Sequence, residues 1–283
     1  MEPVIVIGMH RSGTSLLTRI LEELGVFMGY EKEENEESIY FLRLNEWILS
    51  QANASWDNPY NFRFLKEFHK RIIKEVLVKE LSSKEFLSSY LGNKKFMYSS
   101  LFDLNFLWGW KDPRNTFTLE IWKSIFPRAK VIHVYRNPVD VAESLRIREK
   151  KLRKNFLRTW NSLNYIPKAS NWKIQASPRV ENLNEGFKLW RDYIKEALSW
   201  EKILKNRFMS VKYEDILTEP QSSISKIANF LGLKVNPECL EAITSKINSN
   251  RRYAFRNKQK LLSFYQTIKN DYYVKLLGYD RII

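Results

Sequence analysis

The sequence predicts an α/β fold in three layers, with a central parallel sheet and helices on both of its faces. The first observation is that a β-branched run, Val4–Ile7, leads through a Gly-containing turn into a helical pattern within the first 25 residues. The second is that further short apolar runs follow it, separated by longer helical stretches. Strands that alternate with longer helices favour a parallel sheet covered on both sides.

The expected strands are short apolar runs. Val4–Ile7 is apolar at every position, which is typical of a strand buried on both faces. A run that ends at Arg136-Asn137-Pro138 is the clearest of the others. The four expected strands are Val4–Ile7, a weaker one within Phe106–Trp110, Lys130–Tyr135 and Phe208–Val211.

The expected helices follow the strands. Apolar residues recur at helical spacing over Leu16–Leu24, and Gly25 is expected to end that helix. Two further helices are expected from about Val139 and over Pro220–Leu231, the latter ending at Gly232. Residues 1–283 are expected to form a single domain with helical insertions at about 38–95 and 146–200, because no repeat and no Gly/Ser-rich linker divides the chain.

Composition excludes several classes of protein. With 44% apolar and 28% charged residues, the chain has the balance of a soluble globular protein, and 14% aromatic residues exclude general disorder. No stretch reaches the roughly 18 to 20 apolar residues of a membrane helix, and Val4–Ile7 is too short for a signal-peptide core. The single Cys239 has no partner for an internal disulfide. The sequence therefore predicts a cytoplasmic protein without a membrane span.

The charge is strongly positive and unevenly distributed. A net charge of +15 suggests an anionic ligand or partner, and nucleic acid, polyanionic glycan and a phosphate-bearing cofactor all satisfy it. Residues 22–37 are rich in Glu, whereas 146–158 and 246–260 are rich in Lys and Arg. The run 146–158 is interpreted either as a solvated helix face or as a lid or acceptor surface.

The first loop has the pattern of a phosphate-binding loop. Gly8 and Gly13 are separated by four residues, after a strand and before a helix, where free backbone N–H groups and the helix dipole favour an anion. A nucleotide-binding Walker loop has Lys directly after its second Gly, but this chain has Thr14 there, and its strong cation is Arg11. The fold is therefore expected to be P-loop-like. The alternative is a tight turn that binds nothing. The candidate ligand contacts are His10, Arg11, Ser12, Gly13, Thr14 and Ser15.

The loop Gly8–Ser15 resembles the 5′-phosphosulfate loop of sulfotransferases that use 3′-phosphoadenosine 5′-phosphosulfate (PAPS), in particular a bacterial branch related to tyrosylprotein and carbohydrate sulfotransferases. Arg136, with Ser144 eight residues later, resembles the family's 3′-phosphate motif, and an Arg fork with a hydroxyl suits phosphate oxygens. Lys111-Asp112-Pro113-Arg114 resembles the segment whose Lys reaches the sulfuryl group. Tyr213 resembles a family Tyr beside the nucleotide, and packing at the sheet edge is its alternative.

The resemblance implies an enzyme that transfers a sulfuryl group from PAPS to a hydroxyl or amine acceptor and releases 3′-phosphoadenosine 5′-phosphate (PAP). Arg11 and Lys111 would stabilise the transferring group without a metal. A Glu after the first helix would be the catalytic base, in the order Glu37 and then Glu36, while Glu33 is expected to matter little. The acceptor is expected to be a carbohydrate or another small or polymeric metabolite, with an anionic glycan as one candidate.

Several alternatives remain at this stage. Asp112 is favoured as a capping or pairing residue rather than a catalytic one, because Asp-Pro favours a turn. His10, His69 and His133 are too scattered for a metal site, and His133 is expected to be packed.

The alternative functions are a nucleotide-dependent kinase with a degenerate P-loop and a non-enzymatic protein that binds polyanions or nucleic acid. Both are disfavoured, because the nucleic-acid alternative leaves the ordered motifs unexplained and the kinase lacks its lysine.

Overall fold

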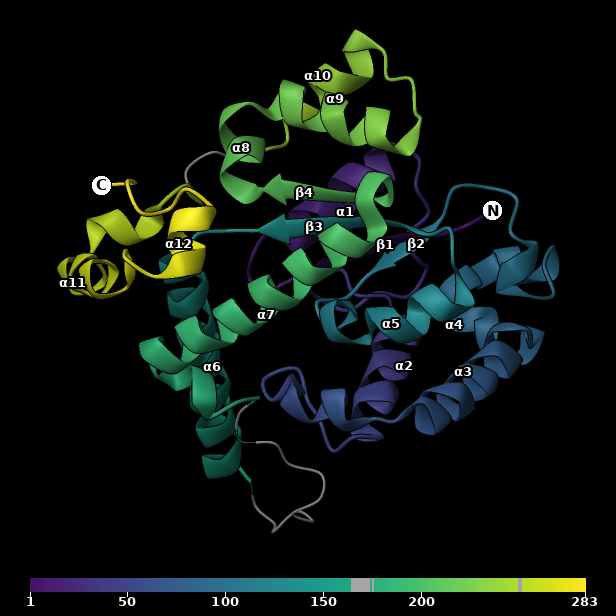
Figure 1. The fold of residues 1–283 in the computed structure, drawn as a ribbon, viewed down its shortest axis with the longest axis horizontal. Helices are drawn as coiled ribbons and strands as arrows, with labels where there is room; N and C mark the ends of the chain where they lie inside the picture. Colours follow the sequence, from purple (N-terminus) through teal and green to yellow (C-terminus); the bar gives the residue numbers. More distant parts are fainter. Residues whose placement is uncertain (164–173, 175, 249–250) are drawn as a thin grey trace. The chain divides into compact units, whose positions relative to one another are not determined.

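The computed structural model describes residues 1–163, 174, 176–248 and 251–283. Figure 1 shows the chain as a ribbon. The chain divides into two compact units. The first comprises Met1–Arg136 and Tyr193–Arg252, and the second comprises Asn137–Asp192 and Tyr253–Ile283. The first unit contains the sheet and the loop that follows its first strand.

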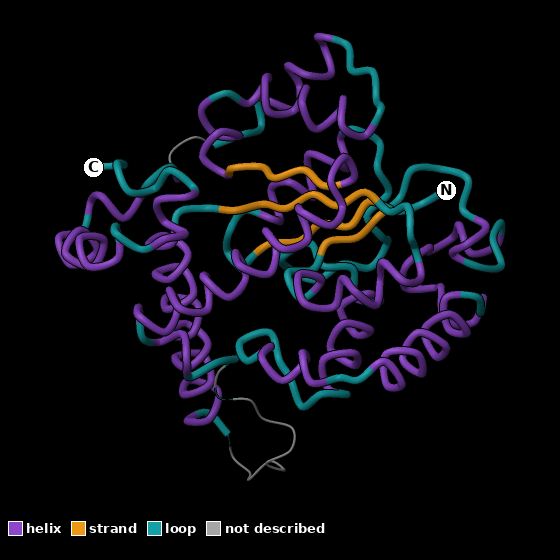
Figure 2. Tube along the Cα trace, viewed as in Figure 1, coloured by secondary structure: helices purple, strands orange, loops and turns teal. Residues whose placement is uncertain are grey.

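The described residues of the first unit form one parallel sheet of four strands, drawn in orange in Figure 2. The strands are β1 (Val4–Gly8), β2 (Gly109–Lys111), β3 (Lys130–Tyr135) and β4 (Phe208–Lys212), in the spatial order β2-β1-β3-β4. Val6 pairs with Lys111 of β2 and with Ile132 of β3, so the carboxyl ends of β1, β2 and β3 lie at one edge of the sheet. In parallel sheets this edge is where ligands usually bind.

Two hydrophobic clusters cover the two faces of this sheet. Val4 and Val6 belong to one cluster, whereas Ile5 and Ile7 belong to the other, because successive side chains of a strand point to opposite faces. All four are at most 1% exposed, and burying each such side chain stabilises the fold by about 1.5–3 kcal/mol. The helices against Val4 and Val6 are α1 (Thr14–Glu23), α8 (Tyr213–Thr218), α9 (Pro220–Leu231) and α10 (Pro237–Thr244). Those against Ile5 and Ile7 include α2 (Ile39–Ser50), α3 (Glu67–Leu81), α4 (Ser88–Leu91) and α5 (Asn115–Ile125).

An aromatic cluster anchors the helices on the second of these faces. The ring of Phe41 in α2 stacks on Trp110 of β2 with centroids 4.0 Å apart, and Trp122 of α5 meets Trp110 edge to face at 5.0 Å. These rings are fully buried. Aromatic pairs add about 0.5–1.5 kcal/mol beyond their buried area, so β2 is held firmly although it has only three residues.

The second unit is helical. Its elements are α6 (Pro138–Asn161), the first part of α7 (Leu183–Leu204), α11 (Gln259–Ile268) and α12 (Tyr272–Leu276). The Asn137 side chain caps α6 by accepting from the Asp140 amide at 2.9 Å. The basic run 146–158 lies on α6, mostly exposed, and Arg146, Arg148 and Arg153 form ion pairs with neighbouring acids. The structure therefore favours its interpretation as a solvated helix face.

The predicted fold class is confirmed: an α/β fold with three layers around a parallel sheet. The predicted strands all form, and β2 extends to Lys111 rather than ending before it. The insertion at 38–95 contains α2, α3 and α4, whereas part of the one at 146–200 lies outside the described residues. The single domain with two insertions stays a prediction. None of the helices in the described parts of the chain is long and apolar enough to cross a membrane.

Candidate active site

The loop between β1 and α1 is held in an unusual backbone conformation. Gly13 precedes α1 with φ of 100°, and Arg11 has φ of 70°, which is rare for a residue with a side chain. A Cβ atom on Gly13 would lie 2.1 Å from Cδ2 of Tyr213, so no other residue fits there without displacing the ring. The loop thus opens the free N–H groups of the α1 N-terminus at the carboxyl edge of the sheet, where an anion is favoured.

The hydroxyl groups of the loop have different surroundings. Ser12 is fully buried, and its hydroxyl lies 2.6 Å from the Met9 carbonyl and 3.0 Å from the Val134 carbonyl. Its single hydrogen therefore lies between a carbonyl of the loop itself and one of β3. Ser15 donates to the backbone carbonyl of Asn35 at 2.7 Å, and Thr14 is buried at the start of α1.

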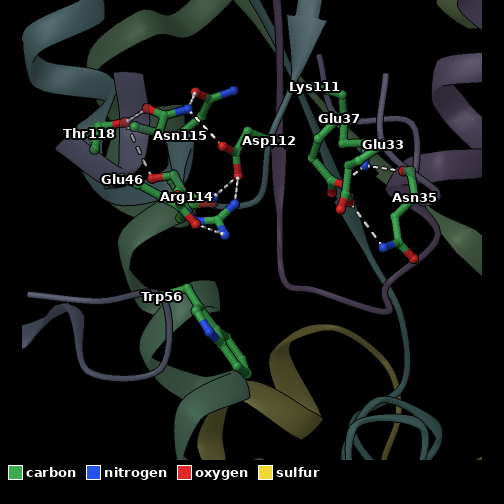
Figure 3. A network of polar contacts seen from close by, with 12 residues as sticks. Glu33, Asn35, Glu37, Glu46, Trp56, Lys111, Asp112, Arg114, Asn115 and Thr118 are labelled. Atoms are coloured by element: carbon green, nitrogen blue, oxygen red, sulfur yellow. Dashed lines mark hydrogen bonds and ion pairs between the residues drawn. The ribbon is translucent and has the colours of Figure 1, made fainter. Parts of the chain in front are cut away.

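Asn35 contacts three of the predicted site residues, and Figure 3 shows it beside one of them, Lys111. Its backbone carbonyl accepts hydrogen bonds from Ser15 Oγ and Lys111 Nζ, and its side-chain oxygen accepts from Arg11 Nη1 at 3.3 Å. Its amide nitrogen donates to Glu33 Oε1 at 3.0 Å. Asn35 was not identified from the sequence, because a backbone acceptor leaves no signal in the residue type.

Lys111 and Glu37 form a buried ion pair beside Asn35. Lys111 is 1% exposed and Glu37 is 4% exposed, and Lys111 Nζ donates to Glu37 Oε1. Burial raises the pKa of Glu37 to about 8, and a hydrogen bond to Glu33 and the charge of Asp112 act in the same direction, against the charge of Lys111. Burial lowers the pKa of Lys111, although Glu37 opposes the shift. A carboxyl with a pKa near neutrality is suited to general base catalysis.

The other glutamates of the acidic loop separate into distinct environments. Glu31 and Glu34 are exposed, whereas Glu37 is buried. Glu36 contacts Lys32 at 2.8 Å and Arg19 at 3.4 Å instead of Lys111. Partial burial by itself would raise the pKa of Glu36, but these two cations together lower it below its ordinary value. Of the two predicted base candidates, only Glu37 therefore lies in the cluster with Lys111.

Asp112 has the structural role that the sequence favoured. Its Oδ1 accepts from the backbone amide of Arg114 at 2.9 Å and from Arg114 Nη1 at 3.1 Å, which closes the turn before α5. Its Oδ2 accepts from Asn45 at 3.0 Å. The Asn45 side chain is completely buried and satisfies further polar groups. They are Asn115 and Thr118, both labelled in Figure 3, and Trp122.

Arg136 and Tyr213 lie together at the ends of β3 and β4. The Arg136 guanidinium lies 4.6 Å from the centroid of the Tyr213 ring, and its Nη2 donates to the Arg251 carbonyl at 2.9 Å. Tyr213 is 6% exposed and packs against Gly13. One ring thus packs against both the loop between β1 and α1 and Arg136, so packing and a ligand contact are compatible for Tyr213. Ser144 lies in α6 of the second unit.

Two of the histidines have aromatic or buried surroundings. The ring of His10 lies 4.7 Å from Trp56 in an edge-to-face arrangement and 6.3 Å from Tyr193. His133 is buried in β3, and burial lowers its pKa to about 3, so it is packed as expected. Within residues 1–163, 174, 176–248 and 251–283, no group of three or more His, Cys, Asp and Glu side chains is arranged to hold a metal ion.

Comparisons with known proteins agree with one another. A family model described as "Sulfotransferase family" matches residues 3–237. A 3-beta-hydroxysteroid sulfotransferase of Cavia porcellus is 26% identical over 174 residues, which cover 57% of this chain and 51% of the relative. Sulfotransferase 2A1 of Macaca fascicularis is 28% identical over 142 residues, which cover 50% and 44%. The chain spans about half the length of the curated relatives it matches.

Among solved structures, the chain is similar to the sulfotransferase domain from the curacin biosynthetic pathway. The sequences are 17% identical, the TM-score is 0.47, and the match covers 89% of this chain and 79% of the other.

Proposed function

Because the chain belongs to the sulfotransferase family, we propose that it transfers a sulfuryl group from PAPS to a hydroxyl or amine acceptor and releases PAP. The observation that carries the proposal is the buried pair Lys111–Glu37, joined through Asn35 to Arg11 and Ser15 of the phosphate loop. These contacts gather a buried carboxyl group, two cations and the start of α1 at one edge of the sheet, which supports the proposed roles of base, charge stabilisation and anion binding.

The loop has the features that a phosphosulfate requires. Positive φ at Arg11 and Gly13 and the absence of a Cβ at Gly13 leave the backbone N–H groups at the start of α1 available to phosphate oxygens. Thr14 and Ser15 begin that helix and would hold the 5′-phosphate with these amides. His10, Ser12 and Gly13 would shape the loop, with the Ser12 hydroxyl bonded to backbone.

The nucleotide side would depend on Arg136 and Tyr213. Arg136 would bind the 3′-phosphate, since a guanidinium matches phosphate oxygens in a fork, and the Tyr213 ring holds it in position. Ser144 as a second 3′-phosphate contact stays a prediction from the sequence. No metal is needed in this scheme, because Arg11 and Lys111 supply the positive charge.

The transfer step uses a base and two cations. PAPS supplies an activated sulfuryl group, whose bond to the 5′-phosphate oxygen breaks as the acceptor oxygen bonds to sulfur. Glu37 accepts the proton that the acceptor hydroxyl loses, Lys111 stabilises the sulfuryl oxygens, and Arg11 stabilises the charge on the departing phosphate. Because Glu37 acts when deprotonated, turnover should rise with pH through the pKa of Glu37.

The acceptor is proposed to be a carbohydrate or another hydroxyl-bearing metabolite. The net charge of +15 attracts anions in general, and PAPS is itself one, so an acidic glycan is one candidate acceptor beside neutral ones. The Cavia porcellus relative is named for a hydroxysteroid. Small neutral alcohols such as sterols should therefore be tested as acceptors beside the anionic ones.

The test is transfer of labelled sulfate from PAPS across a panel of glycans, phenols, sterols and peptides. The wild type should label at least one class, and Glu37→Gln should abolish turnover while its PAP affinity, measured by calorimetry, stays within about twofold of wild type. ATP is the matched control nucleotide, because the kinase alternative requires ATP to bind and PAP to bind weakly. Transfer of phosphate from ATP, or PAP binding no tighter than 5′-AMP, would contradict the proposal.

A further inference from the structure

We propose that Glu33 is a positioning residue for sulfuryl transfer: it shares one proton with Glu37 across a tight acidic turn and so sets the pH range in which Glu37 accepts a proton from the acceptor. The proposal rests on the function proposed above. It replaces the sequence-based expectation that Glu33 matters little.

The backbone brings the two carboxyl groups together. Lys32 and Ser38 form an antiparallel bridge, and inside it the Glu33 amide donates to the Glu37 carbonyl at 2.9 Å. The Glu36 amide donates back to the Glu33 carbonyl at 3.0 Å, which closes the turn. Residues 33 and 37 are therefore opposite each other at the mouth of this turn, and their carboxyl groups meet beside Lys111 (Figure 3).

One oxygen of each carboxyl group is held by a nitrogen donor. Glu33 Oε1 accepts from the amide of Asn35, and Glu37 Oε1 accepts from Lys111. The side chain of Glu37 is 5% exposed, and its second oxygen, Oε2, is buried and accepts no hydrogen bond from the described parts of the chain. A buried carboxylate oxygen without a donor is costly, but a protonated one donates instead. The neighbouring acceptor for such a proton is the carboxylate of Glu33.

The charged groups around the pair support this arrangement. Glu37 faces Glu33, Lys111 and Asp112, and Glu33 faces Glu37, Lys111 and Arg114. Partial burial by itself would raise the pKa of Glu33. The hydrogen bonds of Glu33 to Glu37 and Asn35, together with the two nearby cations, outweigh burial and lower this pKa. The pKa of Glu37 moves upward. Two carboxyl groups whose pKa values diverge in this way share one proton, held on the group with the higher pKa.

Removing the charge of Glu33 should therefore make Glu37 a weaker base that works at lower pH. Glu33→Gln keeps the shape of the side chain but removes the negative charge that favours a proton on Glu37. The acid limb of the kcat/KM profile should move to lower pH by about 0.5–1 unit, which corresponds to a three- to tenfold change in the ionised fraction of Glu37 on the acid side of the limb. The plateau should fall, because a weaker base accelerates proton transfer less.

The experiment follows the titration directly as well as the rate. Protein labelled with ¹³C in Glu carboxyl groups is titrated without co-substrate, and the resonance that disappears in Glu37→Gln is followed in wild type, Glu33→Gln, Glu33→Asp and Glu34→Gln. Glu34 is the matched control, since it lies in the same turn but is exposed. The midpoint for Glu37 should fall in Glu33→Gln, stay close to wild type in Glu33→Asp, which keeps the charge, and not change in Glu34→Gln.

The outcomes separate this proposal from the proposed function. A Glu37 midpoint that does not move in Glu33→Gln overturns the shared proton, whatever the enzymatic activity. If Glu33→Gln does not fold, Glu33→Ala decides the matter, because it also removes the charge and should lower the Glu37 midpoint, whereas the midpoint should stay at the wild-type value if Glu33 has no role. A midpoint that moves in a protein that transfers no sulfate leaves the pair standing and refutes the function. An active enzyme whose midpoint moves while its pH–rate limb stays fixed overturns the positioning role.

Discussion

Gly13 is a position where the loop between β1 and α1 should be sensitive to a single methyl group. Gly13→Ala introduces two separate penalties. The backbone has φ of 100°, which an L-residue adopts at a cost of about 1–2 kcal/mol. The new Cβ would also lie 2.1 Å from Cδ2 and 2.7 Å from Cε2 of Tyr213, far inside van der Waals contact. The ring has little room to retreat, since Tyr213 is 6% exposed and the Arg136 guanidinium lies 4.6 Å from its centroid.

The chain offers a control that carries only the first penalty. Gly25, just after α1, has φ of 87°, and a Cβ there would meet no atom within 4 Å. Gly25→Ala should therefore destabilise by about 1–2 kcal/mol, from backbone strain alone. Gly13→Ala should destabilise by about 1–3 kcal/mol more than that, because forcing a methyl group into a packed site adds a cost of this size.

Urea unfolding followed by circular dichroism measures both variants, and PAP calorimetry shows whether the loop still binds. Gly25→Ala should keep PAP affinity, whereas Gly13→Ala should lose most of it. In the Gly13→Ala background, Tyr213→Ala should be less destabilising than in wild type, because it removes the clash. Equal destabilisation by the two glycine variants, with no coupling to Tyr213, would refute the packing argument.

Variants at four further positions test other parts of the site. Arg11→Ala should lower sulfuryl-transfer turnover by roughly a hundredfold and affect PAP binding less, while Arg11→Lys should recover part of the rate, as single-turnover kinetics will show. Arg136→Ala should weaken PAP by about 2–4 kcal/mol in calorimetry and leave 5′-AMP unaffected. Asn45→Leu should destabilise by about 3 kcal/mol or more in urea, since it leaves several buried donors and acceptors unpaired. Glu36→Gln should reduce stability by less than about 1 kcal/mol at pH 7. This difference should shrink as pH falls below the ordinary Glu pKa and disappear once pH has passed through the lowered pKa of folded Glu36, because both states are then protonated.

The strands were predictable because their signals are local. Val4–Ile7 and Lys130–Tyr135 are apolar runs with turn residues after them, and no tertiary information is needed to find them. The strand β2 was the least certain, because its three residues form a strand only through pairing with β1. The helices α10, α11 and α12 were not predicted. α10 and α12 are short, with 8 and 5 residues, and depend on packing, whereas α11 has 10 residues with its buried side chains at helical spacing, a signal that the sequence analysis missed.

The site was predictable only where side chains carry the chemistry. Arg11, Lys111 and Glu37 stand out by type and position, and the structure brings them to one place. Asn35 acts mainly through its backbone carbonyl, which any residue type offers, so no motif reports it. Glu33 was missed because its proximity to Glu37 depends on a turn within a run of similar acidic residues.

The charges of the buried cluster explain why one proton belongs to it. Glu33 and Glu37, both ionised, against Lys111 leave a net charge of −1 in a site where two of the three groups are almost completely buried. Uncompensated charge is costly there, and one shared proton makes the cluster neutral. A cluster that already holds this proton cannot accept the proton of an acceptor hydroxyl without becoming positive, so the proton must leave before transfer. With Glu33→Gln the cluster is neutral with Glu37 ionised, so Glu37 is ready to act as a base at a lower pH than in the wild type.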